Sequence, residues 1–332
     1  MKSCQIKRET RCGIETIIIE NALIRAVILA GKGADLLEFI WKPLNINCLY
    51  RSDVPMEVYK NLDLKNKRLK NHSDYTLGGW SDVLPHRGEY ENIVLEQDNG
   101  GIAATIPYKC EILSDTKDFV SIKLSAELPV FPMLVEKIFQ ISESEPTKLF
   151  ISENVKNIGN DKMNFTWTQH ALFGGDFIDA DNENTEIITT SNRVFKAWEH
   201  MENPNNPLEK FEDEIHNVNL RQGTFDLRKP LPRGCSEYEF VVYNHLQKGE
   251  AILLNKKNNL QVKMNWDLNE FPYLRALYQN TGRENVVGLE PSNDLFSGWE
   301  HSKNHKTFTT LNKNESICTN FQLEYLEWES EN

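Results

Sequence analysis

One histidine and one glutamate, each on a segment that reads as a β-strand, have the side chains that acid–base chemistry needs. In the run 163–173 successive side chains point to opposite faces, so His170 shares a face with small polar residues such as Thr168, and the other face is apolar. Two glycines follow, and glycine in a strand is typical of a bulge or of a ligand that approaches the backbone. A core histidine hydrogen-bonded to a threonine is the alternative interpretation.

A carboxylate lies near the end of a second run, 286–291. Gly288 and Glu290 share one face of this run, and the glycine leaves open space beside the carboxylate. Pro291 has no N–H and restricts Glu290 to an extended conformation, so the carboxylate is presented at a strand end. A histidine and a glutamate on open faces of two strands predict an acid–base pair that transfers protons.

Short apolar or β-branched runs separated by turn residues recur along the chain and must position these two groups. The first three, 15–20, 23–29 and 34–41, predict an antiparallel meander. The later runs are 102–106, 108–113, 119–128, 135–141, 147–156, 163–173, 238–243, 251–255, 261–266, 273–279, 286–290, 307–311 and 317–328, with a shorter one near 223–227. Many strands with closely spaced turns are typical of a large antiparallel β-sandwich. We therefore expect an all-β fold in which residues 1–332 form a single domain.

The segment 77–90 is rich in glycine, contains a proline and predicts a loop. It gathers Trp80, Asp82, His86 and Arg87 within a few residues, a content that is frequent in binding loops. In a loop, Arg87 is expected to contribute to binding and little to stability. The alternative is a tight turn with ordinary surface charges.

Two polar stretches, 51–76 and 196–236, have no sustained strand period and are expected to cross the surface, the first with a short helix. The lysine-rich part of the first, 60–70, is interpreted as a solvated face rather than a binding site.

The charge balance argues against nucleic acid or an anionic membrane as a partner. The 332 residues include 37 Lys and Arg and 49 Asp and Glu, for a net charge of −12, without a long block of one sign. No signal-peptide core begins the chain, and no run approaches the roughly 18 apolar residues of a membrane span, which predicts a cytoplasmic protein. The 6 cysteines are widely spaced and lack metal-ligand spacing, so we expect free thiols and no metal site.

The order of several motifs resembles that of the aldose 1-epimerase (galactose mutarotase-like) superfamily over nearly the whole chain. The segments that carry the resemblance are 21–34, 153–159, 168–174, 266–274 and 288–291. The resemblance implies a galactose mutarotase-like sandwich and an isomerase that interconverts the anomers of a hexose or related sugar. His170 matches the family's catalytic histidine and Glu290 its catalytic glutamate, which implies that they act as acid and base. No metal or cofactor is required.

The segment 79–90 resembles the family's Gly-Gly…Pro…Gly-Arg region, which implies a sugar-binding role for Arg87. The family has a His-Gly pair shortly afterwards, which 101–107 lacks, and His86 is the candidate replacement. The expected sugar contacts are Trp80 and Phe173 for the ring faces, and Arg87, His86 and Asp267 for the hydroxyl groups. Asp267 is equally interpreted as a turn residue at a strand end.

Two other functions stay open at the level of sequence. A non-catalytic carbohydrate-binding protein could use the same fold, because a fold does not fix a function. A glycoside hydrolase usually needs two carboxylates beside the scissile bond, and only Glu290 has a second line of support. Arg87 with a lysine from 60–70 could bind a phosphorylated sugar, and a neutral sugar or a uronate is an equal alternative.

Overall fold

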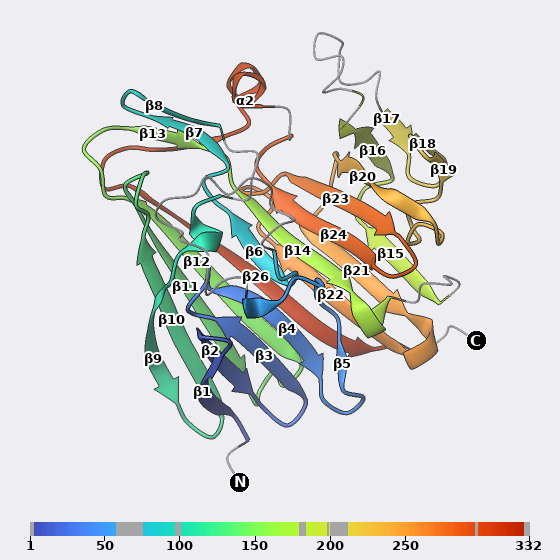
Figure 1. Cartoon of the computed structure of the whole chain (residues 1–332), viewed down its shortest axis with the longest axis horizontal. Helices are drawn as coiled ribbons and strands as arrows, with labels where there is room; N and C mark the ends of the chain where they lie inside the picture. Colours follow the sequence, from blue (N-terminus) through green and yellow to red (C-terminus); the bar gives the residue numbers. More distant parts are fainter. Residues whose placement is uncertain are drawn as a thin grey trace.

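The structure, a computed structural model, describes residues 3–57, 76–96, 101–178, 184–197, 199, 212–295 and 298–328. Two large antiparallel β-sheets pack face to face around an apolar core, and a smaller sheet lies at one end, at the upper left of Figure 1. The lysine-rich part of the expected 51–76 excursion lies outside the described residues. Within the described ranges, no helix is long and apolar enough to cross a membrane.

The larger sheet has twelve strands, and its central strands come from distant parts of the chain. Its order is β1 (Gln5–Arg11), β2 (Ile14–Glu20), β3 (Ile24–Leu29), β4 (Asp35–Trp41), β6 (Trp80–Val83), β14 (Thr168–Gly174), β24 (Asn285–Ser292), β23 (Tyr273–Asn280), β20 (Cys235–Tyr243), β16 (Arg193–Lys196) and β17 (Glu212–Glu214), with β5 (Ile46–Asn47) paired to β4. The neighbours β6, β14, β24 and β23 bring four segments of the chain side by side at the middle of the sheet (Figure 1).

The second large sheet has eight strands. Their order is β15 (Thr185–Thr189), β21 (Glu250–Asn255), β22 (Leu260–Trp266), β26 (Ser316–Glu327), β12 (Lys148–Asn157), β11 (Met133–Ser142), β10 (Phe119–Glu127) and β9 (Lys109–Asp115). The smaller sheets are β25 (Thr309–Leu311), β13 (Met163–Phe165), β7 (Arg87–Tyr90) and β8 (Ile93–Glu96), and the hairpin of β18 (Val218–Leu220) and β19 (Gly223–Phe225). The short helical elements include η3 (Ala103–Thr105), η4 (Gly175–Phe177), η6 (Lys256–Asn258) and α2 (Trp299–His305).

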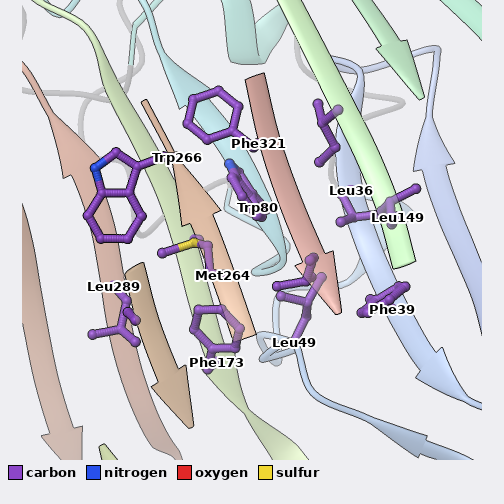
Figure 2. Close-up of a cluster of buried hydrophobic side chains, with 14 of the residues drawn as sticks. Leu36, Phe39, Leu49, Trp80, Leu149, Phe173, Met264, Trp266, Leu289 and Phe321 are labelled. Carbon is purple, nitrogen blue, oxygen red and sulfur yellow. The ribbon is translucent and has the colours of Figure 1, made fainter. Parts of the chain in front are cut away.

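The two large sheets are buried in different ways. Buried and partly exposed residues alternate along β11 and β12, because one face of the eight-stranded sheet packs on the core and the other meets solvent. In β24 only the first residue is partly exposed, so the middle of the twelve-stranded sheet is covered on both faces. Figure 2 shows the core side, where Leu289 and Phe173 of the twelve-stranded sheet lie in the same cluster as Met264 of the eight-stranded one.

Four polar side chains are enclosed between the two sheets, and we call them the core network: Asp82 of β6, Lys137 of β11, Glu153 of β12 and Gln169 of β14. Lys137 forms ion pairs with Asp82 and, at 3.6 Å, with Glu153. The amide of Gln169 donates hydrogen bonds to Asp82 and, at 2.8 Å, to Glu153. Burial raises the pKa of Glu153, and the nearby charge of Asp82 acts in the same direction. The network joins the two sheets through charged contacts.

The large antiparallel β-sandwich predicted from the turn spacing is confirmed. Three local predictions are wrong. The run 163–173 is not one strand but two, β13 and β14, which belong to different sheets. The segment 77–90 is not a loop but forms β6 and β7, and its glycines at 78 and 79 provide positive φ values of 79° and 75° just before β6. The run 102–106 contains the helical turn η3 rather than a strand.

The expected excursion at 196–236 is also more ordered than its composition indicated. It contains the short strands β17, β18 and β19 and the beginning of β20, whereas 200–211 lie outside the described residues.

Candidate active site

His170 of β14 and Glu290 of β24 lie side by side on one face of the twelve-stranded sheet. The antiparallel register that pairs Thr168 with Ser292 places them directly opposite each other. Nε2 of His170 is 3.5 Å from Oε1 of Glu290. The His170 side chain is 14% exposed and that of Glu290 is 0% exposed, so only the histidine of the pair reaches the surface. This arrangement can pass a proton between the two groups or to a molecule bound over them.

The carboxylate of Glu290 is buried without the hydrogen bonds that would normally support a buried charge. Among the residues that the structure describes, none donates a hydrogen bond to either of its oxygens. Burial raises its pKa to about 7, and the charge of Arg275 limits the rise. A buried acid whose pKa lies near neutrality can both accept and release a proton at physiological pH, as a general base must.

Arg275 of β23 is the cation beside this carboxylate, and the sequence analysis missed it. It pairs with Glu290 across β23 and β24, with Nη2 3.7 Å from Oε2. Its Nη1 donates a 2.9 Å hydrogen bond to Oγ1 of Thr168. The signal in the sequence was a single arginine within the otherwise largely apolar run 273–279, a position at which a charge needs a buried partner.

Arg87 of β7 is buried rather than exposed in a loop, and its charge acts on Arg275. Its Nη1 is 3.3 Å from Oδ2 of Asp294, and their side chains are 6% and 0% exposed. Nδ1 of His86 lies 3.2 Å from the same Nη1. Asp294, which the sequence analysis also missed, accepts a 2.7 Å hydrogen bond from the hydroxyl of Ser302. The predicted sugar contacts Arg87 and His86 therefore lie together, with Arg87 ion-paired inside the protein.

Apolar clusters flank these polar groups. Val242 of β20 pairs with Arg275, which places it on the same face of the sheet, and the guanidinium carbon of Arg275 is 5.2 Å from the centre of the Phe240 ring. The cluster on this side consists of Phe195, Ala197, Phe240, Val242 and Leu295, and a second cluster near β2 to β4 consists of Ile14, Ile18, Val27, Leu29, Leu37 and Leu77. Low polarity around the charged groups strengthens the interactions between them.

Solved structures match this chain over almost its whole length, although no protein-family profile matches the sequence and no curated protein sequence matches it significantly. A galactose mutarotase-like protein from Clostridium acetobutylicum is 14% identical with a TM-score of 0.67, and 98% of this chain and 100% of that one are covered. A galactose mutarotase related enzyme from Lactobacillus acidophilus is 14% identical with a TM-score of 0.59, covering 95% and 98%. A proposed aldose 1-epimerase from Klebsiella pneumoniae is 10% identical with a TM-score of 0.67, covering 95% and 80%.

The chain has the galactose mutarotase-like fold. At these identities the likeness concerns the fold, and it confirms the resemblance of the sequence motifs at that level.

Within the galactose mutarotase-like fold of this chain, three of the predicted sugar contacts lie away from the histidine and glutamate. Trp80 and Phe173 are 3% and 0% exposed and point into the core between the sheets (Figure 2), so the prediction that they form an aromatic surface for a sugar is wrong. Asp267 follows β22 of the other sheet, is exposed, and accepts a 2.9 Å hydrogen bond from the backbone N–H of Asn269. It is the strand-end turn residue of the alternative interpretation.

A hollow of about 480 Å³ lies beside the end of β24 rather than over His170 and Glu290. Its walls include Tyr273 and Asn293, which adjoin the strands of the site, together with Phe308 and Glu315. Its lining also includes Glu270 and His305, but we place the chemistry at His170 and Glu290, because these two side chains are held 3.5 Å apart on adjacent strands. In the described ranges, no three His, Cys, Asp or Glu side chains are grouped so that they could hold a metal ion.

Proposed function

We propose that this protein is an aldose 1-epimerase-type enzyme that interconverts the anomers of a hexose or related sugar. The observation that carries the proposal is the His170–Glu290 pair, with 3.5 Å between Nε2 and Oε1 on one face of the sheet. The names of fold neighbours, among them a galactose mutarotase related enzyme, support the same class of reaction.

The reaction needs one proton to arrive and another to leave. The protonated imidazole of His170 gives a proton to the ring oxygen, while the carboxylate of Glu290 takes the proton of the C1 hydroxyl. The bond between C1 and the ring oxygen breaks, which leaves an open-chain aldehyde with a new hydroxyl group. Rotation about the bond from C1 to C2 presents the other carbonyl face, and the reverse transfers close the ring. The net change is inversion at C1, with both residues returned to their starting states.

The short distance between the acid and the base fits this reaction better than glycoside hydrolysis. The ring oxygen and the C1 hydroxyl are attached to the same carbon, so the groups that serve them must lie close together. A glycoside hydrolase places two carboxyl groups roughly 5–9.5 Å apart. The carboxylate next along the chain from Glu290 is Asp294, which is ion-paired with Arg87. A hydrolase is therefore the weaker alternative.

The direct test is NMR exchange spectroscopy on a panel of reducing sugars, including neutral hexoses, uronates and sugar phosphates. Wild-type protein is expected to accelerate the exchange of at least one sugar, and Glu290→Gln is expected to abolish most of that acceleration. Glu136→Gln, on β11 of the other sheet, is a matched control that should behave as wild type. Calorimetric binding without any acceleration by the wild type would replace the proposal with a carbohydrate-binding protein.

A further inference from the structure

The two oxygens of the Glu290 carboxylate face two different partners. Oε1 is 3.5 Å from Nε2 of His170, and Oε2 is 3.7 Å from Nη2 of Arg275. The three side chains come from the adjacent strands β14, β24 and β23, so the backbone pairing of the sheet sets their spacing. Arg275 is 4% exposed, which keeps this contact away from water.

Arg275 is itself held in place from two sides. Its Nη1 donates a 2.9 Å hydrogen bond to Oγ1 of Thr168, and that oxygen is 2.7 Å from Oγ of Ser292. The ring of Phe240 packs against the guanidinium. A guanidinium keeps its proton in proteins, so a cation fixed by these contacts stays beside the carboxylate at every working pH.

The other charged groups that face this pair are Asp294 and Arg87, which act on Arg275 in opposite directions. They also form an ion pair with each other at 3.3 Å, so their combined effect on the carboxylate is small. Ser81 of β6, paired with His170, is neutral, and β20 presents the apolar Phe240 and Val242. Apart from His170, the acid of the pair, Arg275 is therefore the cation on which the charge of Glu290 depends.

We propose that Arg275 is a positioning residue that keeps Glu290 ionised and directed at His170. The inference rests on the proposed function, because it assigns Glu290 the role of base. A fully buried carboxylate that loses its neighbouring cation takes up a proton, since burial disfavours the charged form. Without Arg275, Glu290 would be a neutral acid near pH 7 and could not accept the C1 proton.

The test measures the protonation of Glu290 through stability, without any substrate. Urea unfolding is followed from pH 4 to pH 10 for wild type, Arg275→Gln and Arg275→Lys, each with and without Glu290→Gln. Since the folded pKa of Glu290 is raised from its ordinary 4.5 to about 7, the unfolded chain releases its proton first. As the pH rises from the unfolded to the folded pKa of Glu290, each protein that keeps Glu290 therefore loses stability relative to the same protein with Glu290→Gln. Above the folded pKa, the difference in stability between the two stays constant.

The pH at which this loss ends is expected near 7 in wild type and about 1–3 units higher in Arg275→Gln, the usual effect of removing a close opposite charge. Arg275→Lys should give a smaller rise, because it keeps the charge but lacks the planar fork. Arg193→Gln removes an arginine that is ion-paired with Glu212 on the same sheet and should leave the end point unchanged. An end point in Arg275→Gln equal to that of wild type overturns the proposal.

If Arg275→Gln folds only in acid, or only when combined with Glu290→Gln, the result supports the proposal, because both conditions remove the unpaired negative charge. If it folds under neither condition, Arg275→Lys decides, and an unchanged end point there counts against the proposal. The acid limb of the anomer exchange rate should move with the stability end point. If the stability end point moves but the pH profile of the exchange rate does not, the role assigned to Arg275 is overturned. If the end point moves and no protein accelerates exchange, only the epimerase function is overturned.

Discussion

The backbone of Gly288 and the carboxylate of Glu290 are so close that a β-carbon on residue 288 would lie 2.9 Å from Oε1 of Glu290. Gly288→Ala should displace the carboxylate slightly, because the end of a flexible side chain yields more easily than the backbone. The new methyl group would also lie 3.2 Å from Cδ2 of Leu172. We expect exchange to slow by about 10–100-fold, since a small misplacement of a catalytic group is costly. Exchange spectroscopy measures the loss, and urea unfolding should show little change in stability.

Gly249→Ala is the contrasting variant, because its β-carbon would lie 2.3 Å from the backbone oxygen of Trp266, away from the site. It should destabilise the protein. An unchanged exchange rate in Gly288→Ala would contradict the idea that the position of the carboxylate limits the reaction.

Glu290→Gln should slow anomer exchange by roughly 10²–10⁴-fold, or about 3–5 kcal/mol of barrier, because the amide keeps the size of the side chain but not its basicity. His170→Asn should cause a similar loss by removing the acid. The double variant should lose little more than either single one, since both groups serve one proton exchange. Exchange rates and calorimetric affinities for the responsive sugar test this, and two fully additive losses would speak for independent roles.

The exchange rate should fall as the pH drops through about 7, the value to which burial raises the pKa of Glu290. The sign follows from the role of the residue, because a base must be deprotonated before it accepts a proton, and protonated Glu290 is inactive. A pH–rate profile of wild type should show this acid limb, and the residual rate of Glu290→Gln should not. If the rate instead fell only below pH 5, it would contradict the claim that burial raises the pKa of Glu290.

Arg87→Ala should destabilise the protein by about 3–5 kcal/mol, because it leaves Asp294 buried without its cation. This replaces the expectation from the sequence that Arg87 adds little to stability, which assumed an exposed loop. Urea unfolding measures the effect, and the same substitution in an Asp294→Ala background should cost less. An unchanged melting temperature with weakened sugar binding would return Arg87 to the role of a ligand contact.

The alternation of side chains was enough to place His170 and Glu290 on the strand faces opposite the core residues Ala171 and Leu289, because a strand has a period of two whatever its partners are. It did not show that this face is also covered, so that Glu290 is 0% exposed. The distance between them depends on the register of β14 and β24, which lie far apart in the sequence. The burial of Arg275 depends in the same way on β20 and β24. Pairings between distant strands leave no local trace in a single sequence.

The errors have a related cause. Trp80 was assigned to the site by residue type, and an aromatic ring suits a sugar and a core equally well. Its indole N–H donates a 2.6 Å hydrogen bond to Gln169 inside the sandwich, a partner that becomes visible only when β6 pairs with β14. The glycines and the proline of 77–90 predicted a loop. Its two strands, β6 and β7, are so short that turn residues make up much of the segment.

The core network determines how the two sheets of the sandwich come together during folding. Apolar contacts between two sheets are non-directional and tolerate a small slide, whereas Lys137 meets Asp82 in a single alignment. A partly docked pair of sheets would leave a charge dehydrated without its counter-ion, which is strongly unfavourable. The two sheets are therefore expected to dock in an all-or-none step. A sandwich whose sheets are shifted past each other by one pair of residues should not be stable.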